Sequence, residues 1–422
     1  MRQYLLRWLR KGDNKVLGLL IGSTGLSQVL PILLSPILAR FYSEEAFGYF
    51  GIYIGVVAML SVLNAGRYEL AIVIPKSNVQ SKEILNICLK LSIIVGVCLT
   101  LVSIPLKQVL FKLLNVNFGT FYYFIPISAV FLTINQAFFY YLNKTEKYNT
   151  ISFNKVIQSS SNLALSLLFG IINLLQTSGL YLASLISHFF VLIINSIKTS
   201  GIGLWRFKTN RLQLLLIKKY ANFPKFAVAA HLLNATSQNV PVMIVSSLFG
   251  LKFAGFYAFA NRLVLRPISL IGNSYGDIFR QKAAAAFAEK GECKGLYIEF
   301  LKKLLLIALV PSFILFIGGE KIFEVAFGQN WNEAGKLASH LSVLLLIRFI
   351  SAPLGNMFII AEKQRLDLIW QTILFLLLIT PVAVFQFVEL DFFAFVDLMI
   401  VCLSVGYLLN IVMTYKFALG NG

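Results

Sequence analysis

Apolar runs of membrane-spanning length recur along the whole 422-residue chain. A run of about 20 apolar residues is long enough to cross the hydrocarbon core of a bilayer as a helix. Membrane barrel strands would instead alternate in hydrophobicity over about ten residues, and that pattern is absent. We therefore expect an all-α polytopic membrane protein with about twelve transmembrane helices. They are predicted at 16–40, 46–65, 84–106, 120–142, 153–174, 177–197, 220–249, 254–277, 300–319, 338–361, 368–387 and 392–416.

The excess of basic residues follows the predicted loops. The chain holds 37 Lys and Arg against 18 Asp and Glu, a formal charge of +19. Placing both termini in the cytoplasm puts 27 of the 37 basic residues in inner loops and inner ends. Because inner loops of membrane proteins are enriched in Lys and Arg, this distribution predicts a multi-pass membrane protein with both termini in the cytoplasm. It also accounts for the basic charge without a nucleic-acid partner.

A basic connection divides the chain into two predicted lobes of six helices each. Residues 200–219 form the predicted cytoplasmic linker, between an N-terminal lobe at 1–199 and a C-terminal lobe at 220–422. The outer loops are short, and no extramembrane domain is expected.

The two halves also show a weak internal repeat. Gln28 and Pro31 in the first span correspond to Gln238 and Pro241 at a constant offset of 210 residues. An even number of predicted spans separates the copies, so the two lobes are expected to be related by a parallel pseudo-two-fold axis along the membrane normal. Transporters built from such repeats place their substrate at the repeat interface.

The eighth predicted span carries two arginines inside the membrane. At 100° per residue, one face of its helix collects polar side chains from mid-membrane to the inner surface. These are Arg262, Arg266, Ser269, Asn273, Asp277 and Arg280. An arginine near the bilayer centre costs about 2.5–3.5 kcal/mol, so such a face is expected to meet water, a counter-charge or an anionic ligand. Snorkelling to the interface is the alternative, and it suits Arg262 better than Arg266.

Other polar side chains extend this predicted substrate cavity. His231 and Gln238 share a face of the preceding span, Gln28 lies on a polar stripe of the first span, and Arg348 lies within a later span. A polar stripe can also serve only interhelical hydrogen bonding, which remains open for the first span. Guanidinium groups bind phosphate in a bidentate way, so the mainly positive buried charge predicts an anionic, phosphorylated cargo. No catalytic or metal-ligating set is expected.

Three sequence blocks carry a family resemblance. They are "LARFYSEEAFGYF" (38–50), "GRYELAIVIP" (66–75) and "FYAFANRLVLRPISLIGNSYGDIFRQKAA" (256–284). Together they resemble the Wzx-type polysaccharide flippases, the polysaccharide biosynthesis branch of the multidrug/oligosaccharidyl-lipid/polysaccharide (MOP) exporter superfamily. Where family members usually have an acid before Phe-Gly, this chain has Ala46 before Phe47 and Gly48. Arg266 is an additional charge.

The resemblance implies a MATE-like transporter rather than an enzyme. Its expected substrate is an undecaprenyl-pyrophosphate-linked oligosaccharide repeat unit, flipped from the cytoplasmic to the periplasmic leaflet of a bacterial cytoplasmic (inner) membrane by alternating access. The product would be O-antigen or capsule, and a polysaccharide polymerase and a chain-length regulator are candidate partners. No cofactor is expected, although an H⁺ or Na⁺ gradient is a candidate driving force. The chain lacks a nucleotide-binding motif.

Five charged residues are candidates for a gate or a substrate-access site. Arg67 and Glu69 lie at the predicted inner mouth, where a plain structural ion pair is equally compatible with the sequence. Arg40 lies at the outer end of the first span, where positional anchoring is the alternative. Asp277 lies near the inner end of the eighth span and is a candidate partner for Arg280 or Arg266.

Three alternative functions differ in what they require of the chain. A cation-coupled small-molecule or multidrug exporter of the same superfamily would confer resistance to cationic compounds and would not need the arginine pair. A glycan polymerase or ligase would need catalytic or sugar-binding residues outside, and the short outer loops argue against it. A scaffold without transport leaves the buried arginines unexplained.

Overall fold

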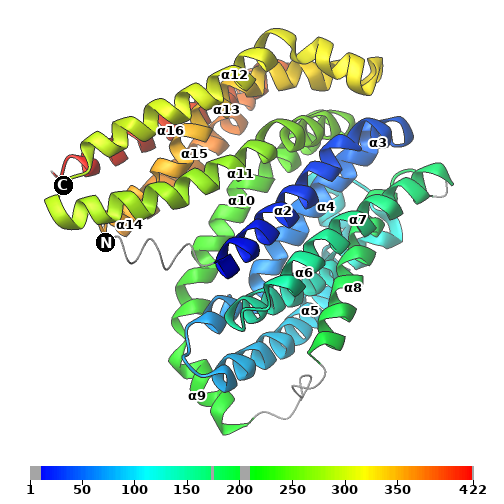
Figure 1. Cartoon of the computed structure of the whole chain (residues 1–422). Coiled ribbons are helices and arrows are strands. Elements are labelled where there is room, and N and C mark those ends of the chain that lie inside the picture. The colour runs from blue at the N-terminus through cyan, green and yellow to red at the C-terminus, as the bar shows by residue number, and fades with distance from the viewer. Residues whose placement is uncertain (1–10, 173–174, 200–209, 421–422) are drawn as a thin grey trace. The chain divides into compact units, whose positions relative to one another are not determined.

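The chain is helical throughout the described residues, in a computed structural model (Figure 1). The structure describes residues 11–172, 175–199 and 210–420, and it leaves out the side chains of 11–21, 120, 266–270 and 273. No strand occurs in this part of the chain. The expected all-α class is therefore confirmed.

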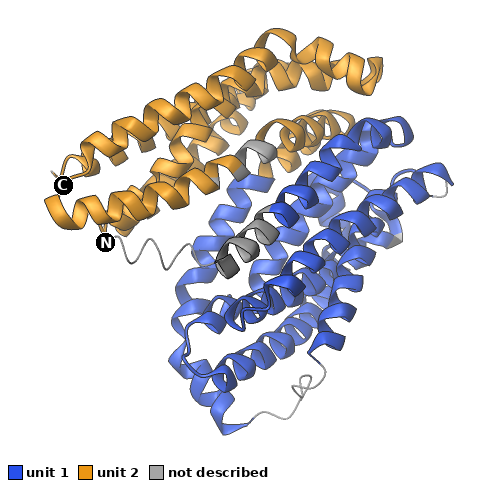
Figure 2. Cartoon of the chain, viewed as in Figure 1, with its two compact units in different colours: residues 1–239 blue, residues 240–422 orange. Residues whose placement is uncertain are grey.

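The helices gather into two compact units. Unit 1 comprises residues 1–239 and unit 2 comprises residues 240–422, so the boundary falls inside one helix (Figure 2). Of the predicted linker, residues 200–209 lie outside the described part of the chain, and the remainder includes a short helix, Arg211–Lys219. The lobe boundaries and the repeat axis expected from the sequence stay predictions.

Unit 1 begins with a first span that is broken in two. Pro31 lies in the last turn of one helix, and the next helix begins at Ser35 with Pro36 in its first turn, where a proline costs no hydrogen bond. The elements of this unit are α2 (Lys11–Leu33), α3 (Ser35–Phe41), α4 (Glu44–Asn64), η1 (Tyr68–Val73), α5 (Asn78–Leu114), η2 (Gly119–Tyr123), α6 (Phe124–Lys144), α7 (Tyr148–Ile171), α8 (Gly179–Lys198), α9 (Arg211–Lys219), η4 (Phe223–Ala227) and the first half of α10 (Val228–Phe249).

Unit 2 contains the second half of α10 and the helices that follow it. They are α11 (Leu251–Lys290), α12 (Lys294–Phe327), η5 (Gln329–Trp331), α13 (Asn332–Leu354), α14 (Met357–Ile360), α15 (Gln364–Phe385) and α16 (Phe392–Ala418). Asp391 begins α16 by accepting a 2.7 Å hydrogen bond from the backbone N–H of Ala394. Such a cap satisfies one of the donors that a helix start leaves unpaired.

Nine helical segments among the described residues are long and apolar enough to cross a membrane. They coincide with nine of the twelve predicted spans. The other three predictions fall on α7, α10 and α11, which have 24, 22 and 40 residues and are therefore long enough to span. These helices carry most of the polar residues discussed below. The chain is a multi-pass membrane protein.

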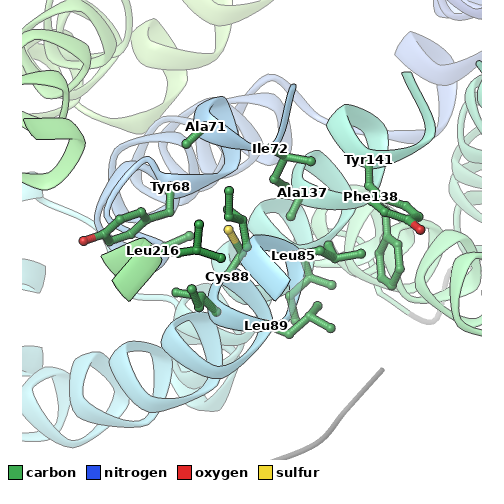
Figure 3. Packing of buried hydrophobic residues seen from close by; sticks show 14 of the residues in the cluster. Tyr68, Ala71, Ile72, Leu85, Cys88, Leu89, Ala137, Phe138, Tyr141 and Leu216 are labelled. Carbon is green, nitrogen blue, oxygen red and sulfur yellow. The ribbon is translucent and has the colours of Figure 1, made fainter. Parts of the chain in front are cut away.

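The core of unit 1 joins short segments to long helices. Tyr68, Ala71 and Ile72 of η1 pack against apolar side chains of α5, α6 and α9, including Cys88 and Leu216 (Figure 3). All five are at most 5% exposed. This packing holds the short η1 turn, which carries two predicted site residues, in a fixed position.

In unit 2, α12 and α13 touch through their backbones. A Cβ placed on Gly335 would lie 2.7 Å from Glu320 Cα and 2.8 Å from the carbonyl oxygen of Gly319. Ser339 Oγ, one turn further along α13, donates a 2.9 Å hydrogen bond to the carbonyl of Leu315. Small residues at such positions let membrane helices approach closely without a layer of side chains between them.

Candidate functional site

Arg67 occupies a left-handed turn at the end of α4. Gly66 and Arg67 both have positive φ, 56° and 60°, and η1 starts directly after them. A glycine enters this region without penalty, whereas an arginine does so only when its surroundings hold it there. Gly66 lies against Pro224 of η4, so the turn is packed on the segment that leads into α10. The arrangement directs the Arg67 side chain toward the start of that helix.

The Arg67 guanidinium connects two residues that are far apart in sequence. Its Nη1 lies 3.0 Å from Glu69 Oε1 in an ion pair, with side-chain exposures of 12% and 0%. Its Nη2 lies 3.0 Å from Nδ1 of His231 in α10. Because a guanidinium can only donate, His231 Nδ1 must be the acceptor in this contact. The structure thus brings the predicted gate pair together with a predicted cavity residue inside unit 1.

Glu69 is buried with incomplete pairing. The ion-pair distance is short, but among the described residues neither carboxylate oxygen accepts a well-directed hydrogen bond, and Arg67 Nε is likewise buried with no acceptor there. Burial raises the pKa of the Glu69 carboxyl, and the positive charge of Arg67 partly offsets this effect. A buried ion pair with unmet hydrogen bonds contributes little net stability, because the cost of removing both charges from water offsets their attraction.

The polar face predicted on α10 is present. Gln238 Nε2 donates a 2.7 Å hydrogen bond to Asn234 Oδ1, one turn earlier, and both residues are exposed. His231 is exposed as a whole residue and lies two turns from Gln238. The described residues therefore form a continuous polar strip from His231 to Gln238.

The polar stripe on α2 serves partly for helix packing. Thr24 Oγ1 accepts a 2.9 Å hydrogen bond from Lys155 Nζ of α7, and the carbonyl of Ser27 accepts one of 2.7 Å from Ser159. These contacts agree with the interhelical alternative for the first span. Gln28, the predicted cavity residue of this stripe, is half-buried.

The arginine-bearing face of α11 lies in unit 2. Arg262 is half-buried in this helix, while the side chains of Arg266 and Asn273 lie outside the description. Arg280 Nη2 lies 3.1 Å from Asp277 Oδ1, so Arg280, one of the two candidate partners, pairs with this carboxylate. The two side chains are 53% and 74% exposed, and a pair so open to its surroundings contributes little to stability.

Arg348 contacts an aromatic ring, and Arg40 lies at a helix end. The Arg348 guanidinium, on α13, lies 5.9 Å from the ring centroid of Tyr407 on α16, a cation–π contact. Arg40 is exposed in the last turn of α3, where a positive charge complements the helix dipole. The structure gives Arg348 an aromatic partner within unit 2.

Two sets of interacting polar residues were not predicted from the sequence. His340 Nδ1 of α13 bonds Asp397 Oδ1 of α16, although neither residue's sequence context indicates the other. A cluster of amides with Lys155 and His188 lines a cavity among α6, α7 and α8. Lys155 lies only two residues inside the predicted fifth span, so by sequence alone it resembles an inner-loop anchor.

Comparisons with known proteins agree with the resemblance found in the sequence. A family model described as "Polysaccharide biosynthesis protein" matches residues 37–336. Lipopolysaccharide biosynthesis protein WzxC of Escherichia coli (strain K12) is 22% identical over 362 residues, which cover 81% of this chain and 69% of that protein.

Solved structures of two transporters have a similar fold. The lipid II flippase MurJ in an inward closed conformation has a TM-score of 0.71 at 15% identity, covering 95% of this chain and 87% of that one. An inward-facing multidrug resistance MATE family transporter of the MOP superfamily has a TM-score of 0.68 at 16% identity, covering 95% and 93%. At these identities the likeness shows the fold alone.

The matched range contains the positions of Arg40, Arg67, Glu69, His231 and Arg262. The resemblance to Wzx-type polysaccharide flippases is thereby confirmed at the level of family. Because the match extends over 37–336, well over half of the sequence, the chain belongs to the polysaccharide biosynthesis protein family and has the fold of the MOP superfamily transporters.

Proposed function

We propose that the protein is a flippase for undecaprenyl-pyrophosphate-linked oligosaccharide repeat units. It would move them from the cytoplasmic to the periplasmic leaflet of a bacterial inner membrane, with both termini in the cytoplasm. The family match is the observation that carries this proposal, since it covers 37–336 and is described as polysaccharide biosynthesis. The name of WzxC, a lipopolysaccharide biosynthesis protein, supports the same class of product.

The arginines of α11 are the proposed contacts for the pyrophosphate. Arg262 is half-buried in a helix of 40 residues, and Arg266 follows it one turn later on the same face. A guanidinium presents paired N–H donors that match phosphate oxygens, which an ammonium group cannot do as specifically. The transport step would proceed by alternating access, without covalent chemistry on the cargo.

The Arg67–Glu69–His231 group is the proposed access gate of unit 1. Its arginine is 12% exposed and is shared between an acid and an imidazole. An incoming phosphate would compete with Glu69 for the guanidinium, and this competition would link cargo arrival to a change at the start of α10. A polysaccharide polymerase and a chain-length regulator are proposed as protein partners.

Coupling to a proton gradient is proposed through His340 and Asp397. The two side chains bond directly between α13 and α16, and they are 35% and 49% exposed. A carboxylate bonded to an imidazole can exchange a proton without leaving an isolated charge inside the bilayer. In proteoliposomes, Asp397→Asn is expected to abolish the dependence of transport on an imposed pH gradient, and transport that still follows the gradient would exclude this pair.

The decisive experiment replaces Arg262 and Arg266 together by alanine in a strain whose surface glycan depends on this protein. We expect loss of the glycan and accumulation of lipid-linked oligosaccharide in the inner leaflet, at a normal level of protein. Lys290→Ala, in the exposed last turn of the same helix, is the matched control and should leave the glycan intact. Normal glycan in the double variant would remove α11 from the proposed phosphate site.

The same strain separates the proposal from the multidrug exporter alternative. An exporter of cationic compounds would raise the resistance of cells to them, and the arginine variants would not lower it. The fold alone favours neither, because MurJ and the MATE transporter are similarly close to this chain. Glycan loss without a change in drug resistance is the result that distinguishes the flippase.

A further inference from the structure

A partly open pocket lies in unit 1, among α6, α7 and α8, and most of its exposed lining is apolar. Its volume is about 190 Å³, and seven of its twelve lining residues are polar or charged. For comparison, an engineered apolar cavity of roughly 150 Å³ admits one benzene molecule. The space therefore suits a single six-membered ring with substituents rather than a chain of sugars.

Among the described residues that line the pocket, one is a lysine and none is a carboxylate. Lys155 is the charged residue among the described lining side chains, and its Nζ lies 5.7 Å from the ring centroid of Phe139, which also lines the cavity. Thr24 Oγ1 accepts one of its three N–H groups at 2.9 Å. An ammonium without a neighbouring acid repels a metal cation and attracts an anion. One charge matches a carboxylate better than a doubly charged phosphate.

A series of hydrogen-bonded amides fixes part of the polar wall. Asn154 Nδ2 donates to Asn195 Oδ1 at 2.7 Å, and Asn195 Nδ2 donates to Asn135 Oδ1 at 3.3 Å. Asn135 Nδ2 in turn donates to the backbone carbonyl of His188 at 2.8 Å. Each amide is thus held in one orientation by the next, so the polar groups are ordered before any ligand arrives.

The first amide of this series has an unsatisfied hydrogen-bond acceptor among the described residues. Asn154 is 9% exposed, and its Oδ1 is buried without a hydrogen-bond partner among the described residues. A buried acceptor of this kind calls for a donor, which a sugar hydroxyl supplies. Asn154 and Lys155 are adjacent in the sequence, so the unsatisfied acceptor and the positive charge come from the same turn of α7.

We propose that this cavity binds one carboxylate-bearing monosaccharide of the transported oligosaccharide. The carboxylate pairs with Lys155, a ring hydroxyl donates to Asn154, and the apolar face of the ring lies on Phe139. The inference rests on the proposed function and adds to it a preference for cargo that contains an acidic sugar. The site belongs to unit 1 and is distinct from the arginines of α11.

Binding to the purified full-length protein in nanodiscs tests the site directly. Glucuronate, glucose and acetate are titrated by calorimetry at constant ionic strength. We expect glucuronate to bind at least tenfold more tightly than either of the others. Equal binding of glucose would overturn the role of Lys155, equal binding of acetate would overturn the sugar, and no binding of glucuronate would overturn the site.

Variants assign the binding to the cavity. Lys155→Gln is expected to reduce glucuronate affinity at least tenfold, while Lys147→Gln, at the exposed N-terminal end of α7, should not change it. Unchanged affinity in Lys155→Gln would place the sugar acid elsewhere. If Lys155→Gln does not fold, Asn154→Ala provides the second variant, and the wild-type ligand series remains a test in itself.

Transport distinguishes a sugar acid on the cargo from a free one. Proteoliposomes are supplied with an undecaprenyl-pyrophosphate-linked disaccharide ending in either glucuronate or glucose. We expect Lys155→Gln to slow the acidic cargo and not the neutral one. Equal rates for both in this variant would show that a free sugar acid uses the site. Transport of the neutral cargo by the wild type would leave the proposed function standing even then.

Discussion

Arg67 Nη2 lies 3.0 Å from His231 Nδ1, although 164 residues separate the two along the chain. The contact joins the turn after α4 to the first turns of α10. A double-mutant cycle on Arg67→Ala and His231→Ala should therefore give a coupling free energy of about 0.5–1.5 kcal/mol. Thermal unfolding of the four proteins in detergent measures it. Additive effects would mean that the contact contributes nothing to stability.

Removing Arg67 alone is expected to destabilise the protein strongly. Glu69 is 0% exposed, and Arg67→Ala would leave its carboxylate buried without a counter-charge. Breaking a buried ion pair from one side costs about 3–5 kcal/mol. The unfolding midpoint should fall clearly, and Glu69→Gln added to Arg67→Ala should restore most of it. A double variant as unstable as Arg67→Ala would show that the arginine acts through other contacts.

Glu69 should also make stability depend on pH. Its pKa is raised above the ordinary value of 4.5 in the folded protein, so the folded form holds this proton more tightly than the unfolded form does. The resulting stability is present below pH 4.5 and is lost as the pH rises through the raised pKa. Unfolding midpoints between about pH 4 and pH 8 should therefore decline in the wild type relative to Glu69→Gln. Parallel curves for the two proteins would contradict this assignment.

The contact between α12 and α13 should tolerate no added methyl group. In Gly335→Ala the new Cβ would lie 2.7 Å from Glu320 Cα, which cannot move without its helix. Overpacking of this kind costs about 1–3 kcal/mol. Gly318→Ala is the control, because its Cβ would meet only the end of the Ile322 side chain at 3.4 Å. Equal unfolding midpoints for the two variants would refute the close contact.

Regular helical features were predictable because they depend on residues that are close together in the sequence. Apolar runs of sufficient length located nine spans that the structure confirms, and a 100° periodicity located the polar strip around Gln238. The spans on α7, α10 and α11 were also predicted, although their polar residues lower their hydropathy. The pairing of Asp277 with Arg280, three residues apart, followed from the same local geometry.

Contacts between distant segments were not predictable in this way. Nothing in the turn at Gly66 and Arg67 indicates that His231 lies beside it, since the contact depends on how η1 packs against the segment before α10. The His340–Asp397 bond likewise requires the packing of α13 on α16. Lys155 is a different case. A basic residue near the end of a span is typical of an anchor at the membrane surface, and only the packing of α6, α7 and α8 shows that this one lines a pocket.

The glycine contact in unit 2 constrains how this unit can change shape. Packed helices usually slide because side chains between them adopt new rotamers. Where Gly335 meets Gly319, backbone touches backbone, and no such adjustable layer exists. We therefore expect the stretches of α12 and α13 around Gly319 and Gly335 to move together, while Pro311 inside α12 and Pro353 inside α13 leave other parts of both helices able to bend. Bending would then fall on helices interrupted by proline, of which α15, with Pro381 inside it, is an example.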